Sequence, residues 1–298
     1  MTMPDLAELD GAVEAALAHG SEADLQLLGY GEINSVVAWH DASGTYACKR
    51  LPIFADMARL DAYRACFSDY LDALTTSGIA VHDSRLEHLP RADGRVIAYC
   101  VQPALDPGQL APAILRASDT ASDRSAGRAL LTGVLDHIGR TVRPTLGLDA
   151  QLSNWASSPR GLVYLDVTTP MLRDAHGRDR LDTDLFVASL PAPLRPVVRR
   201  FLVRGIVAPY FAVRPATLDV AGNLHKEGLA SWIPDLVAIA NERLEIDLTV
   251  DEVHRHYRRD ARLWAAIQWS RRVDRAWQRH VRRRPYPFLL PGPVDRRL

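Results

Sequence analysis

Two prolines and a glycine interrupt the chain at Pro103-Ala-Leu-Asp-Pro107-Gly108, and the residue pattern differs on the two sides of this break. Proline fixes φ and lacks a backbone donor, so no regular helix or strand continues through such a segment. Short strand-like runs dominate before it, and helical patterns dominate after it. The sequence therefore predicts an α+β fold with two lobes, a small β-rich one over residues 1–103 and a larger helical one over residues 104–298.

In the first lobe, apolar periodicity and turn residues predict a series of short elements. Glycines 29 and 31 fall between two of the expected strands, and Asp93-Gly94 falls in a polar loop between two others. The expected elements are a helix over 5–19, strands within 27–39 on both sides of a glycine turn, a strand over 45–51, a helix over 55–75, and strands over 79–81 and 96–101.

The second lobe is expected to begin with a helix around residues 130–138, which leads into a polar loop. Thr249 and Glu252 form a capping-box pattern, which predicts the start of a long helix through about residue 283. Its inward stripe is predicted from helical spacing to contain Val253, Tyr257, Trp264, Ile267, Val273, Trp277 and Val281.

Composition narrows the classes of function. The chain has 298 residues, 47% of them hydrophobic, and its 36 Lys and Arg balance its 36 Asp and Glu. A net charge of zero argues against attraction to nucleic acid or membranes as a main purpose. Three scattered cysteines fit reduced thiols, and no signal peptide or membrane-spanning run is visible. We expect a cytoplasmic protein that binds neither nucleic acid nor membranes.

Three oxygen-bearing side chains stand close together in the sequence of the second lobe. Asp149 and Asn154 are five positions apart in a loop, and Asp166 ends an apolar run twelve residues later. Carboxylate and amide oxygens suit the binding of Mg²⁺ and the handling of a phosphoryl group. Asp and Asn also favour turns for structural reasons alone, which is the alternative interpretation.

The first lobe offers a possible phosphate-binding loop, Gly29-Tyr-Gly31-Glu-Ile-Asn34-Ser35, since backbone amides approach phosphates closely at glycine. An ordinary hairpin turn is the alternative. The loop is not a dinucleotide fingerprint, because Asn34 takes the third glycine position, and the chain has no P-loop motif. Lys49 follows in a strand with apolar neighbours and needs an anionic partner if it is buried. Asp69 or Asp61, on the next helix, are the partners expected; a water-facing lysine is the alternative.

The order of these features resembles the protein-kinase-like superfamily, and within it the branch of aminoglycoside phosphotransferases and choline kinases. Gly31-x-x-Asn34-Ser35 is similar to the Gly-x-Ser-Asn loop of that branch. The segment from Val101 to Leu110 resembles the hinge at which main-chain groups of those enzymes meet adenine. The resemblance covers residues 25–170 and implies a protein-kinase-like, two-lobed fold.

The resemblance also implies a function: phosphoryl transfer from ATP to a hydroxyl of a small molecule, such as an amino sugar, amino alcohol, nucleoside or antibiotic. Asp149 would accept or orient the hydroxyl, and Asn154 and Asp166 would bind Mg²⁺. Lys49 would hold the α- and β-phosphates. The remaining nucleotide-binding positions would be Gly29, Gly31, Asn34, Ser35 and Gln102. The acceptor would lie near residues 173–184 and 223–232.

Several residues depart from the pattern of the family. Gly147 stands where histidine is usual, two residues before the catalytic aspartate, and Gln151 stands where a cation is common. Val167-Thr168-Thr169 follows the metal aspartate instead of an aromatic residue and glycine. These changes leave two alternatives open, a nucleotide-binding pseudokinase and a kinase-shaped interaction scaffold. In the scaffold, a protein partner would bind the basic end of the last helix, at Arg282-Arg283-Arg284.

Overall fold

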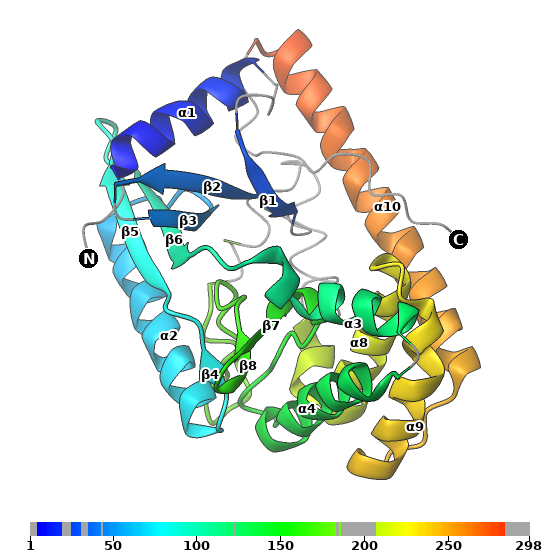
Figure 1. Ribbon diagram of the computed structural model, residues 1–298. Coiled ribbons are helices and arrows are strands. Elements are labelled where there is room, and N and C mark those ends of the chain that lie inside the picture. Colours follow the sequence, from blue (N-terminus) through cyan, green and yellow to red (C-terminus); the bar gives the residue numbers. More distant parts are fainter. Residues whose placement is uncertain are drawn as a thin grey trace.

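Figure 1 shows the computed structural model, which describes residues 5–19, 25–30, 35–42, 44–121, 123–182, 185 and 207–283. Sheet structure dominates the N-terminal part and helices dominate the C-terminal part, so the predicted α+β class is confirmed. The strands are β1 (Leu27–Tyr30), β2 (Ser35–Asp41), β3 (Gly44–Arg50), β4 (Ala80–Val81), β5 (Arg85–Pro90), β6 (Val96–Pro103), β7 (Trp155–Ser158) and β8 (Gly161–Tyr164).

Five strands form an antiparallel sheet in the order β1-β2-β3-β6-β5. Residues 85–90, which the sequence analysis left in a polar loop, form the edge strand β5, so that expectation was wrong. Lys49 on β3 pairs directly with Cys100 on β6, which places both side chains on the same face. The alternation predicted for β3 holds, because Tyr46 and Cys48 are buried while Ala47 and Lys49 are only partly buried.

Each face of this sheet packs against a different helix. Tyr46, Cys48, Tyr99 and Val101 face α1 (Leu6–His19) and form a small core with its apolar side chains. Alternate residues of β6 face the other way, where α2 (Met57–Thr76) and the helical part form the main core. The side chain of Asp56 caps α2 by accepting from the Arg59 backbone amide at 2.8 Å.

A second, smaller sheet joins the two parts of the chain. Its strand order is β4-β8-β7, with β4 parallel to β8 and β7 antiparallel to β8. Figure 1 shows α2 running from the five-stranded sheet down to β4. β6 ends at Pro103, and the short 3₁₀ helix η1 (Pro107–Gln109) follows. The predicted division into residues 1–103 and 104–298 stays a prediction.

The remaining helices gather in the C-terminal part (Figure 1). They are α3 (Ala111–Thr120), α4 (Ser125–Thr141), α8 (Val213–Lys226), α9 (Ile233–Leu244) and α10 (Val250–His280), with 3₁₀ turns η2 (Leu152–Asn154), η4 (Ala208–Phe211) and η5 (Ala230–Trp232). No helix within the described ranges has the length and apolar character that a membrane span requires.

The long helix α10 starts as predicted but does not follow its predicted inward stripe. The side chain of Thr249 accepts a hydrogen bond from the Glu252 amide at 3.2 Å, which caps the helix. Val253 and Tyr257 are buried, as expected. The later members of the stripe, Val273, Trp277 and Val281, are exposed. Helical periodicity identified an apolar face, but no described element covers its second half.

Candidate active site

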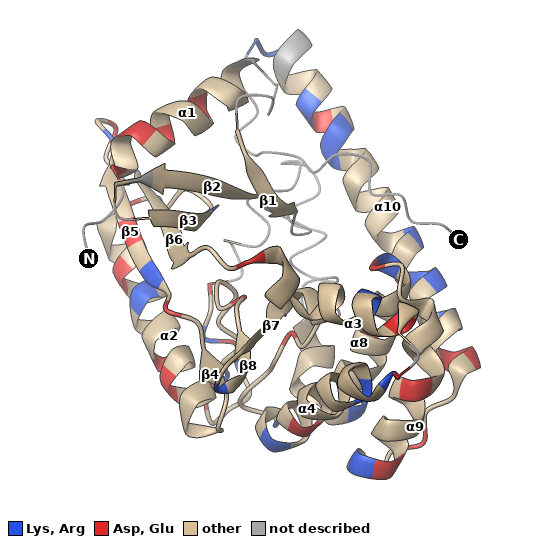
Figure 2. Ribbon diagram, viewed as in Figure 1, with Lys and Arg blue, Asp and Glu red and all other residues tan. Residues whose placement is uncertain are grey.

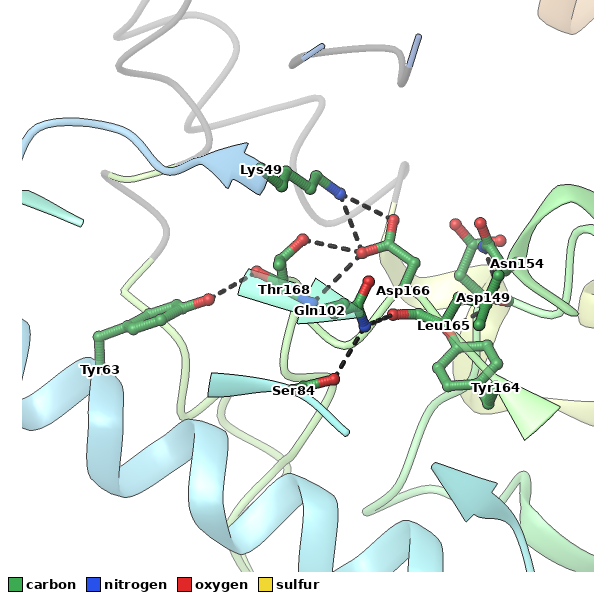
Figure 3. Close-up of polar contacts among 10 residues, drawn as sticks. All are labelled: Lys49, Tyr63, Ser84, Gln102, Asp149, Asn154, Tyr164, Leu165, Asp166 and Thr168. Carbon is green, nitrogen blue, oxygen red and sulfur yellow. Dashed lines mark hydrogen bonds and ion pairs between the residues drawn. The ribbon is translucent and has the colours of Figure 1, made fainter. Parts of the chain in front are cut away.

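The centre of the site is an ion pair between β3 and the segment after β8. Lys49 Nζ donates to both oxygens of Asp166, at 2.9 Å to Oδ1 and 3.0 Å to Oδ2 (Figure 3). The two side chains are only 18% and 29% exposed, so the pair is mostly shielded from water. The expected partners of Lys49 on α2 were wrong: Asp69 pairs with Arg180, and Asp61 pairs with Arg64.

Asp166 is held by its own loop as well as by Lys49. Its Oδ1 accepts from the backbone amide of Thr168 at 3.2 Å and from the Thr168 hydroxyl at 2.8 Å (Figure 3). Burial alone would raise the pKa of this carboxyl, but the charge of Lys49 and these hydrogen bonds together lower it. Asp166 is therefore a carboxylate at neutral pH. Thr168, one of the residues that depart from the family pattern, orients it.

Asp149 occupies a loop whose backbone is tightly fixed. Its carbonyl accepts from the Asn154 side chain and from the Tyr164 hydroxyl, each at 3.0 Å. The neighbours Leu148 and Ala150 are buried and anchor the loop in the core. Burial, followed by the nearby carboxylates of Asp219 and Asp166, raises the pKa of Asp149 to about 7. Such a carboxyl exchanges its proton near neutral pH, which suits a general base.

Gly147 is closely packed, at the position where histidine is usual in the family that the sequence resembles. A Cβ atom there would lie 3.0 Å from Met171 Cβ and 3.2 Å from both Phe211 Cε2 and the Tyr210 carbonyl oxygen. The loop is oriented by other contacts: the Tyr70 hydroxyl donates to the Gly147 carbonyl at 3.2 Å, and the Gly147 amide donates to the Met171 carbonyl at 2.9 Å. The missing histidine therefore does not leave the loop unsupported.

The proposed metal positions, Asn154 and Asp166, lie on the same side of the loop as Asp149. Figure 3 shows the side chains of all three directed toward the side on which Lys49 enters. Asn154 donates its Nδ2 to the Asp149 carbonyl. One carboxylate and one amide oxygen suit Mg²⁺, which usually takes one or two carboxylates and completes its shell with phosphates and waters. No group of three or more His, Cys, Asp or Glu suited to a metal occurs in the described part of the chain.

The structure describes only some of the predicted nucleotide-binding positions. Gly31 and Asn34 lie outside the described residues. Gly29 lies in β1 at a shift in register, and Ser35 begins β2. The Ser35 hydroxyl is buried and has no hydrogen-bond partner among the described residues. The Gln102 side chain is engaged within the protein: its amide donates to Ser84 Oγ and to the Leu165 carbonyl, both at 2.8 Å.

A family model described as "Family of unknown function (DUF6206)" matches residues 8–275. The chain belongs to this family. No curated protein matched the DUF6206 chain in a sequence comparison.

Among solved structures, the DUF6206 chain is similar to WaaP in complex with acyl carrier protein, at 17% identity and a TM-score of 0.36, over 77% of this chain and 91% of that one. It is similar to the PknI kinase domain of M. tuberculosis at 16% identity and a TM-score of 0.31, over 74% and 94%. It is also similar to the MAP kinase LmaMPK10 from Leishmania major, at 12% identity and a TM-score of 0.36, over 92% of this chain and 74% of that one. With TM-scores this low, the site has to be interpreted from the contacts within the DUF6206 chain.

Two residues near Asp149 were missed from the sequence. Asp219 and Lys226 lie on α8, which packs against η2, and the charges of both act on Asp149. They are seven positions apart and so share a face of the helix. The amino-acid composition could have drawn attention to Lys226. Of the 36 basic residues 34 are arginine, and the two lysines are Lys49 and Lys226. In this DUF6206 chain, both lysines thus act on carboxylates of the candidate site.

Proposed function

We propose that this protein is an ATP- and Mg²⁺-dependent phosphotransferase that acts on a hydroxyl group of a small molecule. The observation that carries the proposal is the ion pair between Lys49 and Asp166, which joins residues 117 positions apart beside Asp149 and Asn154. The protein-kinase-like resemblance of the sequence, including its aminoglycoside phosphotransferase branch, belongs to the same proposal. A mostly shielded ion pair gives little net stability over well-packed apolar residues, so its presence points to a role in the site.

The residues present fit a metal–nucleotide complex. Asp166 and Asn154 would hold Mg²⁺, and Lys49 and the Ser35 hydroxyl would contact phosphate oxygens. The bound complex supplies the phosphoryl group and neutralises the charge that develops during its transfer. Thr168 keeps the Asp166 carboxylate in place, and the buried residues on both sides of Asp149 keep its loop rigid. Positioning of this kind accounts for most of the catalysis in phosphoryl transfer.

Asp149 would accept the proton of the acceptor hydroxyl. A carboxyl with a pKa raised to about 7 is a better base than an ordinary aspartate and is still largely ionised at slightly alkaline pH. Asp219 and Lys226 flank it on α8, so they would line the acceptor side of the site. Lys226 would supply the positive charge that Gln151 does not, since its charge acts on Asp149.

A second candidate function is a nucleotide-binding pseudokinase. It is favoured by the state of Asp166, whose two oxygens are both engaged by Lys49, with Oδ1 also accepting from Thr168. A metal ion at Asp166 would have to compete with these donors. In this function the pair would bind nucleotide without turnover.

Thermal unfolding with ATP, with and without Mg²⁺, tests both candidates without knowledge of the acceptor. Ligand at about a hundred times its Kd stabilises the folded state by roughly 2.7 kcal/mol. The proposal expects a Mg²⁺-dependent rise in Tm that Asp166→Asn abolishes. Asp93→Asn, in the solvent-exposed turn between β5 and β6, is the matched control and should keep the rise. A rise without Mg²⁺ dependence would favour the pseudokinase, and no rise with either nucleotide mixture would contradict both.

If the Mg²⁺-dependent rise in Tm is found, the next experiment is a search for the acceptor. We would screen amino sugars, amino alcohols and nucleosides for ATP turnover, and test each positive with Asp149→Asn. The proposal expects turnover to fall by about 10²-fold or more, which is the usual contribution of a general base. Turnover unchanged in Asp149→Asn would reject Asp149 as the base.

A further inference from the structure

The second half of α10 presents an apolar stripe to solvent. Its members are Trp269, Val273, Trp277 and Val281, which are 68%, 48%, 55% and 55% exposed and which we call the α10 stripe. They are spaced four residues apart, and the backbone hydrogen bond from Val281 to Trp277 continues the helix to the last of them. Residues at this spacing lie above one another on one face. Exposed tryptophans in such a row are unusual on a surface without a partner.

The helix is held so that the α10 stripe faces outward. Its first half is anchored in the core by Val253 and Tyr257. Arg271, two residues from both Trp269 and Val273, projects from the opposite side of the helix and is buried. One side of the helix is therefore covered, whereas no described element covers the stripe. Three alanines beside the stripe, at positions 265, 266 and 276, are also exposed and would let another helix approach closely.

Charge around the α10 stripe is strongly one-signed. Residues 262–283 contain seven arginines and one acidic residue, Asp274, although the whole chain is neutral. Figure 2 shows this basic character along the upper part of α10. Of these arginines, Arg272 is exposed on one side of the stripe. The row on the other side, Ser270, Asp274 and Gln278, meets its first cation at Arg282, after the helix has ended at His280.

We infer that the α10 stripe docks an amphipathic helix of a partner protein that carries carboxylates along one edge. The apolar face of that helix would cover the two tryptophans and seat against the alanines, in the manner of knobs and holes. Its acidic edge would lie beside Arg272, and its other edge beside Asp274. A lipid surface would present the same charge on both sides, and a second copy of α10 would bring arginines against arginines. The inference is independent of the proposed function.

The probe for this surface is a labelled synthetic helix of about three heptads, with leucine at its core positions and glutamate along one edge. Fluorescence anisotropy with the full chain should detect binding that weakens as salt is raised. A peptide with lysine in place of the glutamates should bind about tenfold or more weakly. The double variant Trp269→Ala, Trp277→Ala should also lose about tenfold or more, because tryptophans dominate such interfaces.

Arg272→Glu should weaken binding of the glutamate peptide and strengthen that of the lysine peptide, whereas Arg258→Glu, on the exposed anchored half of the same helix, should change neither. Thermal unfolding confirms that each variant is folded. Equal binding of both peptides, or none, would overturn the inference. So would sedimentation with phosphatidylglycerol vesicles that the double variant loses, which would point to lipid. A concentration-dependent dimer that the double variant abolishes would assign the stripe to a second copy instead.

Discussion

Tyr63 and Tyr70 lie two turns apart on one face of α2, and each donates a hydrogen bond to the backbone of a segment that bears a candidate site residue. The Tyr63 hydroxyl donates to the Thr168 carbonyl at 2.9 Å, and the Tyr70 hydroxyl donates to the Gly147 carbonyl at 3.2 Å. Thr168 in turn holds Asp166, and Gly147 begins the loop of Asp149. One helix of the N-terminal part therefore sets the positions of both carboxylates.

Tyr70→Phe removes one hydroxyl from this arrangement without changing the packing of the ring. Because Tyr70 is fully buried, we expect unfolding free energy to fall by about 1 kcal/mol, the usual net contribution of a hydrogen bond. Urea unfolding of the wild type and variant measures it. Thr75→Ala, which removes an exposed hydroxyl bond at the end of the same helix, should cost less. Equal losses in both variants would mean that the Gly147 contact has no special weight.

Gly147→Ala should destabilise the protein by about 1 to 3 kcal/mol, because the new methyl group meets Met171, Phe211 and the Tyr210 carbonyl at 3.0 to 3.2 Å. The control is Gly11→Ala in α1, where nothing lies within 4 Å of the added Cβ. That change should be neutral or stabilise by up to about 1 kcal/mol, since alanine favours helix. Chemical unfolding of the two variants should therefore give shifts of opposite sign or clearly different size.

Asp149 should make the stability of the protein fall as pH rises. Its pKa is raised to about 7 in the folded chain, so between about pH 4 and pH 7 the folded state holds a proton that the unfolded state has lost. Asp149→Asn should remove this penalty and stabilise the protein above pH 7, with no gain below about pH 4. A shift of one pKa unit corresponds to about 1.4 kcal/mol. Because the Asp149 side chain is only partly buried, we expect a smaller gain than the full shift would give, on the order of 2 kcal/mol.

Unfolding curves for wild type and Asp149→Asn across pH 4 to 8 would measure this difference. Asp219→Asn provides a second readout, because the Asp219 carboxylate is one of the groups that raise the pKa of Asp149. Asp219→Asn should lower the pKa of Asp149. The stability difference between chains with Asp149 and chains with the Asp149→Asn change should then reach its full size at a lower pH. A constant difference between wild type and Asp149→Asn at every pH would refute the raised pKa.

The pair of Lys49 and Asp166 should contribute stability that is present at neutral pH and lost in acid. The pKa of Asp166 is lowered in the folded chain, so the contribution exists above the unfolded value near 3.9 and disappears as pH falls through the folded value. Lys49→Met should cost on the order of 2 kcal/mol at pH 7, because it leaves a mostly shielded carboxylate without its partner. The cost should shrink as the pH falls below the unfolded value near 3.9.

A double-mutant cycle of Lys49→Met and Asp166→Asn isolates the coupling between the two side chains. The exposed pair of Arg95 and Asp93 is a suitable reference, since the two side chains are 50% and 49% exposed and such surface pairs contribute little. Coupling at the shielded pair should exceed that of the reference. Coupling no larger than in the exposed pair would contradict the burial argument.

Much of the fold was readable from the sequence where alternation or helical spacing was strong. The two faces of β3 were predicted from the order of Tyr46, Ala47, Cys48 and Lys49, and the start of α10 from its cap. β5 was missed because Arg85–Pro90 has charged residues, a proline and no clean alternation, and pairing with β6 alone makes it a strand. Periodicity also cannot tell whether an apolar face has a partner, so the second half of α10 was misplaced.

The site was predictable as a set of residue types but not as a set of contacts. Lys49, Asp149 and Asp166 were singled out by their order in the chain, whereas the carboxylate paired with Lys49 was sought on the adjacent helix. Long-range pairing depends on how the second sheet brings Asp166 under β3, and no local pattern encodes it. The same reason hid Asp219 and Lys226, which meet Asp149 only through the packing of α8.

The parallel pairing of β4 with β8 has a consequence for how the two parts of this protein can move or be separated. β4 comes from the N-terminal sequence, yet it completes the sheet that leads to Asp166. The N-terminal sheet cannot rotate freely about Pro103 relative to the helical part. Any such rotation must pivot around β4 or break the hydrogen bonds between β4 and β8. A fragment that starts after Pro103 would lack this strand and expose the edge of β8, which favours aggregation over folding. The candidate site residues and the strand β4 are therefore expected to fold only as parts of one unit.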